Sequence, residues 1–482
     1  MRSARILALA LGALCAALAL TFARPHATPG PALRDFESYY AAGTQWVKGG
    51  SPYTTAIWDA ERTIPGVNPH RYELLPYVGI PQALPVFGAL SRVSYPAAAA
   101  VWLTVLICAA AALVWAVIAL LDLRLGVLGI AGVALFALGF GPLTSDLALG
   151  QVALLSAAAV ALAALGLLRG RTLAGGLAVF AAAIQPNAAL ALVSQATARR
   201  PLLAMAAAFA TFLFSFGLAQ RGQALSLPAY LALLREHGAA EAFATIQFTT
   251  TAIVSSLGVS HGAASLAGWL GPAVSVALWL AGMRALRSDA VLALGFTCAM
   301  LPFALPFFHE HDFVIVLIAA LVCARRVPSR LWPAALIGAL LVSIDWLGLA
   351  QRPDGVLQSA LLASAAAIGY TCFARRSLAT LAWAATPLLL VVACGIAAQN
   401  QPAPVWPDAM RPLPPFAPGA TAAHVWGTEL LYSGLLLPNP FWAALRSLSL
   451  LGCAVLAYLS WKSLADSKRS STGQVLFREN HR

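Results

Sequence analysis

The chain has 482 residues, of which 60% are hydrophobic and 10% are charged, and its mean hydropathy is +0.79. About a quarter of the residues of a soluble protein are charged, so this composition excludes that class and predicts an all-α polytopic membrane protein. The net charge of +12 fits basic residues gathered in short cytoplasmic loops, and nothing in their pattern favours nucleic-acid binding.

Apolar stretches predict roughly 12 to 14 transmembrane helices, because about 20 apolar residues cross the ~30 Å hydrocarbon core as a helix. The seven cysteines all fall within these stretches and therefore read as small core residues, with neither disulfide nor metal spacing. The first stretch fits an uncleaved anchor better than a cleaved signal peptide. In chain order, the stretches are residues 6–23, 96–120, 126–142, 148–168, 172–198, 201–221, 263–283, 290–308, 312–324, 331–350, 357–373, 378–398 and 442–461.

The stretch 172–198 has arginines at both ends, so it should enter and leave the membrane on the same, cytoplasmic side. The sequence Gln185-Pro186-Asn187 predicts the break between two half-helices, since proline removes a helix hydrogen bond. The segment 74–91 holds three prolines, and we expect it to lie along the outer surface, with a kinked span as the alternative.

Three long outer segments should build the functional part of the molecule: residues 24–95, 222–262 and the proline-rich loop 399–441. We expect a main transmembrane domain over residues 1–398 that includes the first of these segments. The loop 399–441, a last transmembrane helix over 442–461 and a cytoplasmic tail over 462–482 complete the chain.

The first outer segment carries a run of residues from Asp35 to Gly43, Asp-Phe-Glu-Ser-Tyr-Tyr-Ala-Ala-Gly, followed by Gly-Gly-Ser-Pro-Tyr ending at Tyr53. This run resembles the first outer loop of GT-C glycosyltransferases that use polyprenyl-phosphate sugars, most closely family 87, which is mannosyltransferase-like. Further similar elements follow in the same order, and the resemblance spans roughly residues 5–330. They are Gly150-Gln151, Ala174-Gly175-Gly176 with Gln185-Pro186-Asn187, and the run from Pro306 to Asp312.

The resemblance implies a GT-C-like bundle that moves a sugar, with mannose expected, from a polyprenyl-phosphate donor to a glycan or lipid acceptor. It makes Asp35 the general base, and chemistry agrees, because a metal-free inverting transfer needs one carboxylate to accept the proton of the acceptor hydroxyl. No cofactor is expected, with a divalent cation left open. Substrate contacts are expected from Glu37, Tyr40, Tyr53, Gln151, Gln185, Asn187, His309, His311 and Asp312.

The expected location is the bacterial inner membrane, with the active site on the outer face and a role in the cell envelope. Simpler interpretations exist for several of these residues. Asp35 could be a solvated charge or a helix N-cap, and Gln151 and Asn187 could only bridge helices. The loop from His309 to Asp312 could be a solvated loop, and Asp345 reads as an interfacial charge.

One departure from the family pattern concerns the donor phosphate. Gln185 stands where the family has a lysine before the proline, and an amide cannot neutralise a phosphate. The charge would then come from Arg34, Arg62, Arg71 or Arg352. The open alternatives are an inactive relative, a lipid or sugar transporter or flippase, and an outer-face ligase that uses a diphosphate lipid donor.

Overall fold

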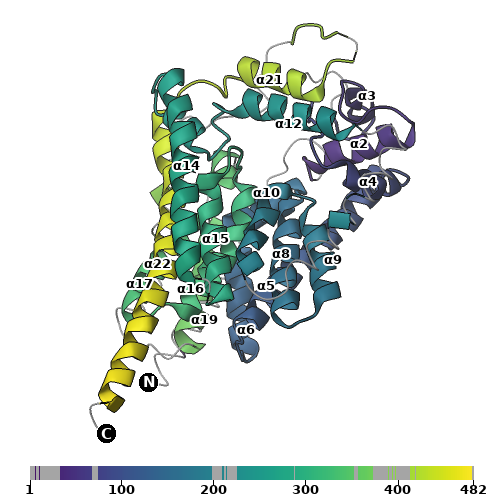
Figure 1. The fold of residues 1–482 in the computed structure, drawn as a ribbon. Helices are drawn as coiled ribbons and strands as arrows, with labels where there is room; N and C mark the ends of the chain where they lie inside the picture. The colour runs from purple at the N-terminus through teal and green to yellow at the C-terminus, as the bar shows by residue number, and fades with distance from the viewer. Residues whose placement is uncertain are drawn as a thin grey trace.

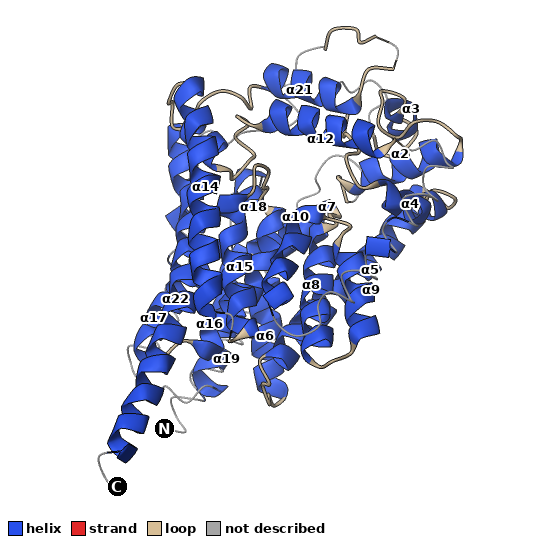
Figure 2. Cartoon of the chain, viewed as in Figure 1, coloured by secondary structure: helices blue, strands red, loops and turns tan. Residues whose placement is uncertain are grey.

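The computed structural model describes residues 33–67, 74–197, 225–286, 288–351, 356–372, 413–417 and 419–479, with a few isolated positions besides. Every regular element in these ranges is a helix, which confirms the all-α prediction for this part of the chain (Figure 2). The predicted spans 6–23, 201–221 and 378–398 lie outside the described residues, apart from single positions.

Three helices are long and apolar enough to cross a membrane: α5 (Tyr95–Leu120), α14 (His261–Leu286) and the Pro440–Ser463 part of α22 (Pro440–Glu479). They match the predicted stretches 96–120, 263–283 and 442–461. The pair α6 (Val127–Leu138) and α7 (Gly141–Leu149) passes the same test together and is bent by 66°. The predicted number of spans therefore exceeds what the described helices show.

Shorter helices fill the space between these long ones and form a layer of their own at one end (Figure 1). In the bundle they are α8 (Ala153–Leu168), α9 (Thr172–Ala182), α10 (Pro186–Ala189), η2 (Leu190–Thr197), α13 (Thr250–Ser256), α15 (Ala290–Ala304), η3 (His311–Ile315), α16 (Val316–Arg326), η4 (Ser329–Leu331), α17 (Trp332–Val342), α18 (Trp346–Gln351) and α19 (Val356–Cys372). In the end layer they are α2 (Phe36–Val47), α3 (Ile57–Glu61), η1 (Pro81–Ala83), α4 (Leu84–Leu90), α12 (Leu227–Glu241) and α21 (Ala422–Ser433).

Helix α9 runs back along α8 in the opposite direction. A Cβ on Gly166 would lie 3.0 Å from the backbone of Gly175, and the Ser156 hydroxyl donates a 2.6 Å hydrogen bond to the Ala182 carbonyl. Because small residues let two backbones approach this closely, α8 and α9 pack tightly. The far end of α9 thus lies beside the start of α8.

After α9 the chain reverses, as the proline in this stretch predicts. Gln185 adopts an extended conformation and Pro186 opens α10. The side chain of Asn187 then donates to the Phe307 carbonyl beyond the end of α15, at 3.3 Å, whereas Gln195 donates to the Ala290 carbonyl at the start of α15, at 3.0 Å. Residues 172–185 therefore run along α8, and residues 187–197 run back in the opposite direction along α15, which agrees with the predicted pair of half-helices.

The segment 74–91 contains no helix of spanning length. It consists of the turn η1 and the seven-residue helix α4, which packs against α2. The approach is close, since a Cβ on Gly43 would lie 2.3 Å from the carbonyl carbon of Phe87. The described residues of this segment therefore contain no transmembrane helix, and its place on the outer surface stays a prediction.

The end layer, which we call the cap, joins all three of the predicted long segments (Figure 1). Residues 53–55 pair with residues 420–422 through backbone hydrogen bonds of 2.9 and 3.0 Å. The Tyr230 hydroxyl of α12 donates to the Val78 carbonyl at 3.0 Å, and Glu429 of α21 accepts from the Leu74 amide at 2.6 Å. Segments far apart in the sequence thus form one layer over one end of the bundle.

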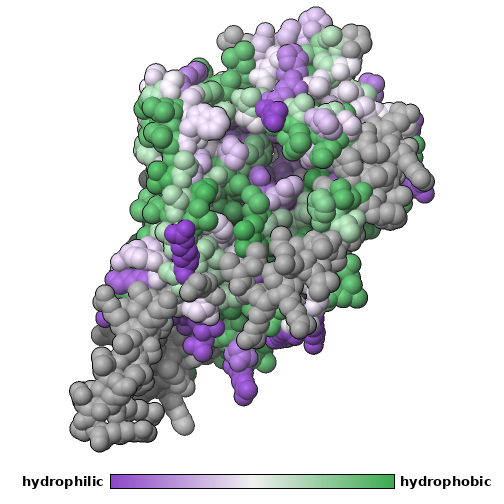
Figure 3. Space-filling model, in the orientation of Figure 1, coloured by the Kyte–Doolittle hydropathy of each residue, from purple (hydrophilic) through white to green (hydrophobic). Residues whose placement is uncertain are grey.

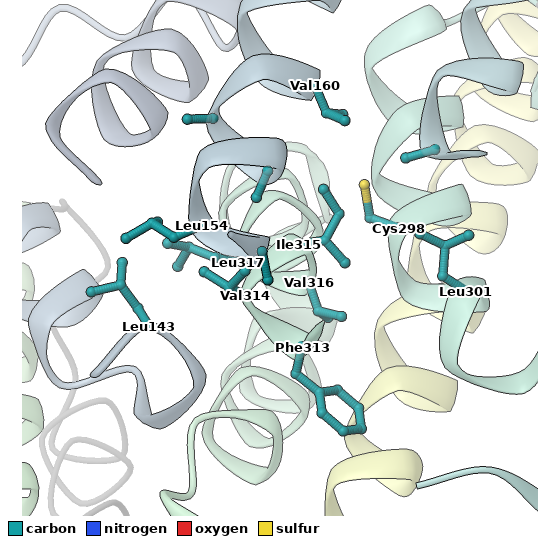
Figure 4. Close-up of a cluster of buried hydrophobic side chains, with 14 of the residues drawn as sticks. Leu143, Leu154, Val160, Cys298, Leu301, Phe313, Val314, Ile315, Val316 and Leu317 are labelled. Atoms are coloured by element: carbon teal, nitrogen blue, oxygen red, sulfur yellow. The ribbon is translucent and has the colours of Figure 1, made fainter. Parts of the chain in front are cut away.

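The bundle core beneath the cap is apolar. Val314 and Ile315 of η3 lie in one cluster with Leu154 of α8 and with Cys298 and Leu301 of α15 (Figure 4). All of these side chains are buried. Of the described cysteines, Cys298, Cys323, Cys394 and Cys453 are buried, as expected of core residues, whereas Cys108 is exposed. This core fixes the start of α8 relative to η3, and both elements carry polar side chains on the cap side.

Candidate functional site

The corner between α7 and α8 is the foundation of the candidate site. Gly150 has a left-handed conformation (φ 80°) and ends α7, which a glycine does at little steric cost. Three groups hold this corner: the Asp35 amide donates to the Leu149 carbonyl at 2.9 Å, and the Trp102 indole donates to the Gly150 carbonyl at 2.7 Å. The backbone amide of Gln151 donates to the Asp146 carbonyl at 3.0 Å.

The Asp35 carboxylate points at this corner. Asp35 is the N-cap residue of α2, but its side chain makes no capping hydrogen bond. Instead its Oδ2 accepts from Gln151 Nε2 at 2.6 Å, and Gln151 Oε1 accepts from the Tyr39 hydroxyl at 2.6 Å. Asp35 and Gln151 are both partly accessible to solvent. The simpler readings of Asp35, as a cap or a freely solvated charge, do not describe its surroundings.

A second carboxylate is held on the loop that precedes η3. Asp312 Oδ1 accepts from Gln185 Nε2, and Oδ2 accepts from the His309 amide at 2.7 Å. The His311 ring lies 3.9 Å from Asp312 Oδ1 and stacks on His309 with a centroid distance of 5.2 Å. The reversal after α9 and the His309–Asp312 loop therefore meet.

The imidazole of His309 connects this loop to the cap. Its Nε2 lies 3.1 Å from Glu241 Oε2 at the end of α12 and 3.1 Å from Gln247 Nε2. Glu241 is buried and also accepts from Gln247 and from the Trp426 indole of α21, while His237 lies 3.4 Å from its other oxygen. One carboxylate thus ties α12, α21 and the His309 loop together.

Electrostatics couple these groups. Burial raises the pKa of Asp35, opposed by Arg34, by the Gln151 hydrogen bond and by His309. Burial likewise raises the pKa of Asp312 to about 6, against the opposing effects of His309 and Gln185. Burial disfavours the imidazolium of His309, yet the neighbouring Glu241, followed by Asp312 and Asp35, raises its pKa above the ordinary value. An imidazolium flanked by carboxylates is therefore favoured at this site.

Further acids surround the cluster. Asp146 of α7 is fully buried, and neither carboxylate oxygen has a hydrogen-bond partner among the described residues. The Ser145 hydroxyl lies 3.2 Å from a carboxylate oxygen of Glu310 and 3.2 Å from one of Asp345. Asp345 is partly exposed and shares this contact with Glu310, and its place at the membrane interface stays a prediction.

We refer to Asp35, Tyr39, Gln151, Gln185, His309 and Asp312 as the polar cluster. In the view of Figure 3, the molecular surface is hollowed between the cap and the bundle, with hydrophilic residues inside the hollow and hydrophobic residues along much of its rim. Of the predicted substrate residues, Asn187 and His311 adjoin the cluster through their contacts with Phe307 and Asp312.

Three predicted substrate residues lie elsewhere. Tyr40 donates to the Val93 carbonyl at 2.8 Å, and Tyr53 is buried in the cap, where its hydroxyl donates to the Gly79 carbonyl at 3.2 Å. Glu37 is also buried, with 1% of its surface exposed. Sequence reasoning missed Tyr39, which lies within the quoted motif, and Glu241, whose segment offered no signal beyond its length.

The arginines expected near a donor phosphate do not lie together. Arg34 is next to Asp35 and lowers its pKa, whereas the guanidinium of Arg62 lies 4.8 Å above the Trp58 ring in the cap. Arg71 and Arg352 lie outside the described residues. Within the part of the chain that the structure describes, no group of three His, Cys, Asp or Glu residues is arranged to hold a metal ion.

Comparison of the chain with protein-family models, with curated proteins and with solved structures finds no match.

Proposed function

We propose that the protein is a membrane glycosyltransferase with a GT-C-like bundle, in which Asp35 is the general base. The observation that carries this proposal is the state of the Asp35 carboxylate. Gln151 holds Oδ2, while Oδ1 receives no side-chain or backbone hydrogen bond from the described residues. Asp35 as a residue is partly accessible, and a positioned base needs a free oxygen within reach of the substrate proton.

The reaction that fits is an inverting transfer from a polyprenyl-phosphate sugar, with mannose as the expected sugar. The acceptor hydroxyl gives its proton to Asp35 Oδ1 while its oxygen forms a bond to the anomeric carbon. The bond from that carbon to the phosphate oxygen breaks, and polyprenyl phosphate leaves with the electron pair. The raised pKa of Asp35 suits the role, because a stronger base accepts the proton more readily once it is ionised.

Charge for the donor phosphate would come from His309 and Arg34. His309 is partly accessible, and its raised pKa favours the imidazolium, which suits an anionic group. Gln185 uses its amide nitrogen on Asp312. Gln185 therefore supports the Asp312 carboxylate, and a direct contact between Gln185 and the donor phosphate has less support.

The hollow between the cap and the bundle offers a place where a lipid-linked donor and a polar acceptor could meet (Figure 3). Its hydrophobic rim suits an isoprenoid chain, and its hydrophilic interior suits a sugar. The polar cluster lies at one end of the bundle, beside the cap. A transporter would place ionisable groups along a path through the membrane, so the arrangement favours a surface reaction over a conduit. We place this end on the outer face of the bacterial inner membrane.

The test is to extract lipids from cells that lack the protein. We expect a polyprenyl-phosphate sugar to accumulate, because its consumer is gone, and its sugar identifies the donor. Re-expression of the wild-type chain should remove it. Unchanged lipid-linked sugars in the deletion strain would contradict the proposal.

A further inference from the structure

We propose that Tyr39 is a positioning residue that fixes the amide of Gln151 in the orientation that presents its N–H to Asp35. This inference rests on the proposed role of Asp35 as general base. It assigns a function to a residue that the sequence analysis passed over in favour of its neighbour, Tyr40.

The two ends of an amide are not equivalent. The Gln151 oxygen can only accept a hydrogen bond, and its nitrogen can only donate. The Tyr39 hydroxyl donates to the oxygen at 2.6 Å, so the nitrogen faces Asp35 Oδ2, also at 2.6 Å. A reversed amide would place its oxygen against the carboxylate, which only a protonated Asp35 could tolerate.

Other groups keep Tyr39 in the donor role. Burial, with Asp35 and Asp146 nearby, raises the pKa of Tyr39 well above its ordinary value, so the phenol keeps its proton. A neutral phenol keeps the hydrogen that it donates to Gln151.

Aromatic packing keeps the Tyr39 ring in place. The ring stacks on Phe87 of α4 with a centroid distance of 4.9 Å and an interplanar angle of 20°. The edge of Tyr77 meets it at 6.1 Å and 87°. Both partners are almost fully buried, at 1% and 0% exposure. Besides packing against α2, α4 and the residues before it therefore hold the Tyr39 ring, which orients Gln151.

The groups that determine the basicity of Asp35 come from several elements. Arg34 on the same segment, Gln151 at the start of α8 and His309 before η3 favour the carboxylate, and burial opposes it. Asp146 of α7 is a further acid close enough to interact with Asp35. Losing the Gln151 hydrogen bond should favour the protonated form of Asp35, so the acid limb of the pH–rate profile should move to higher pH.

The test compares Tyr39→Phe with Tyr40→Phe, an adjacent substitution that also removes one hydroxyl from α2. Tyr40 donates to a backbone carbonyl, at a position away from Gln151. Transfer by reconstituted protein is measured from pH 5 to 9 with the lipid-linked sugar that accumulates in the deletion strain. For Tyr39→Phe we expect kcat at neutral pH to fall about tenfold, with recovery at high pH and little change in KM. Tyr40→Phe should match the wild type.

A double-mutant cycle with Gln151→Leu provides a second test. Gln151→Leu should move the acid limb in the same direction, and adding Tyr39→Phe to it should have little further effect, because both act through one amide. An unchanged acid limb in Gln151→Leu, or fully additive effects in the double variant, would overturn the inference.

The inference and the proposed function fail in different ways. If Asp35→Asn keeps normal transfer at all pH values, Asp35 is not the base and the proposed mechanism fails. If Asp35→Asn is inactive while Tyr39→Phe has the rate and pH profile of the wild type, the mechanism stands and the role of Tyr39 is refuted.

Discussion

The two ends of helix α8 use the same backbone device for different purposes. Gly150 precedes the helix and Gly170 follows it, and both have left-handed conformations, with φ values of 80° and 71°. A Cβ on Gly150 would lie 2.9 Å from the Cβ of Leu33, whereas a Cβ on Gly170 would meet nothing within 4 Å. One turn is enclosed by the segment that carries Asp35, and the other is open.

The flanking residues differ in the same way. Gln151 donates to Asp35 inside the polar cluster, whereas Arg169 and Arg171 are exposed beside Gly170. The open turn only reverses the chain between α8 and α9. The enclosed turn also brings a segment that is distant in sequence against the helix start, so a carboxylate and an amide meet. Packing around a turn, more than the turn itself, makes this end of α8 a candidate site.

Removing the carboxylate at the enclosed end should have the largest effect. Asp35→Asn keeps the shape but cannot accept the proton, so transfer should fall about 100-fold or more, because that is the typical contribution of a general base. Glu37→Gln, two residues along on α2, should be milder. Both are measured as turnover in reconstituted membranes, with folding checked by thermal denaturation. More than a tenth of wild-type turnover in Asp35→Asn would remove this residue as the base.

A methyl group added at each of the two turns tests the difference in packing between them. Gly150→Ala should destabilise the protein by about 2–4 kcal/mol, because the left-handed conformation and the contact with Leu33 both oppose a Cβ. Gly170→Ala carries only the conformational cost of about 1–2 kcal/mol. Thermal denaturation in detergent checks both variants. Equal losses of stability would show that the enclosed turn is not tightly packed.

Changing Gln185 tests the second carboxylate of the cluster. Gln185→Glu places a like charge against Asp312, so donor use at neutral pH should fall about tenfold and recover at lower pH, where the two acids share a proton. Gln185→Lys should form an ion pair with Asp312 and keep activity. Donor dependence is measured for all three forms. The same apparent KM and rate in each would separate Gln185 from substrate binding.

The smallest effect concerns the link between His309 and the cap. Glu241 has its pKa lowered to about 2, because His309 and His237 outweigh its burial, and the pKa of His309 is raised. The stabilisation from His309 is fully present below its unfolded pKa of about 6.5 and is lost as pH rises through its higher folded value. The Tm should therefore fall by about 2 °C between pH 6.5 and 9.

Glu241→Gln should remove most of this pH dependence of Tm. Glu236→Gln is the matched control, because Glu236 lies on the same helix, is partly exposed and contacts Thr421 and His424. It should keep the wild-type dependence. A Tm that falls equally steeply in Glu241→Gln would assign the effect to another group.

Much of this arrangement could be predicted from the sequence, for physical reasons. Apolar stretches identified α5, α14 and α22 because spanning length and composition are local properties. The break at Gln185 was predicted because proline and flanking arginines are also local signals. Asp35, Gln151 and Asp312 were chosen through the family resemblance, and the structure brings them close together.

The rest depended on information that a sequence does not carry. Tyr39 and Tyr40 differ by one position on α2, and a rotation of about 100° per residue decides which hydroxyl faces Gln151. The contact between Glu241 and His309 depends on which loop packs against the end of α12, which the sequence does not show. The contact of Asp345 with Ser145 depends on how α7 packs against α18, which the sequence does not show.

The most direct test of the central claim is the release of polyprenyl phosphate from the lipid-linked sugar that accumulates in cells lacking the protein. Purified protein is reconstituted into liposomes with that lipid and with acceptor-containing membranes from the same cells. The account predicts that wild-type protein releases polyprenyl phosphate and moves the sugar to the acceptor, whereas Asp35→Asn does neither. Intact donor in the presence of folded wild-type protein, or equal release by Asp35→Asn, would contradict it.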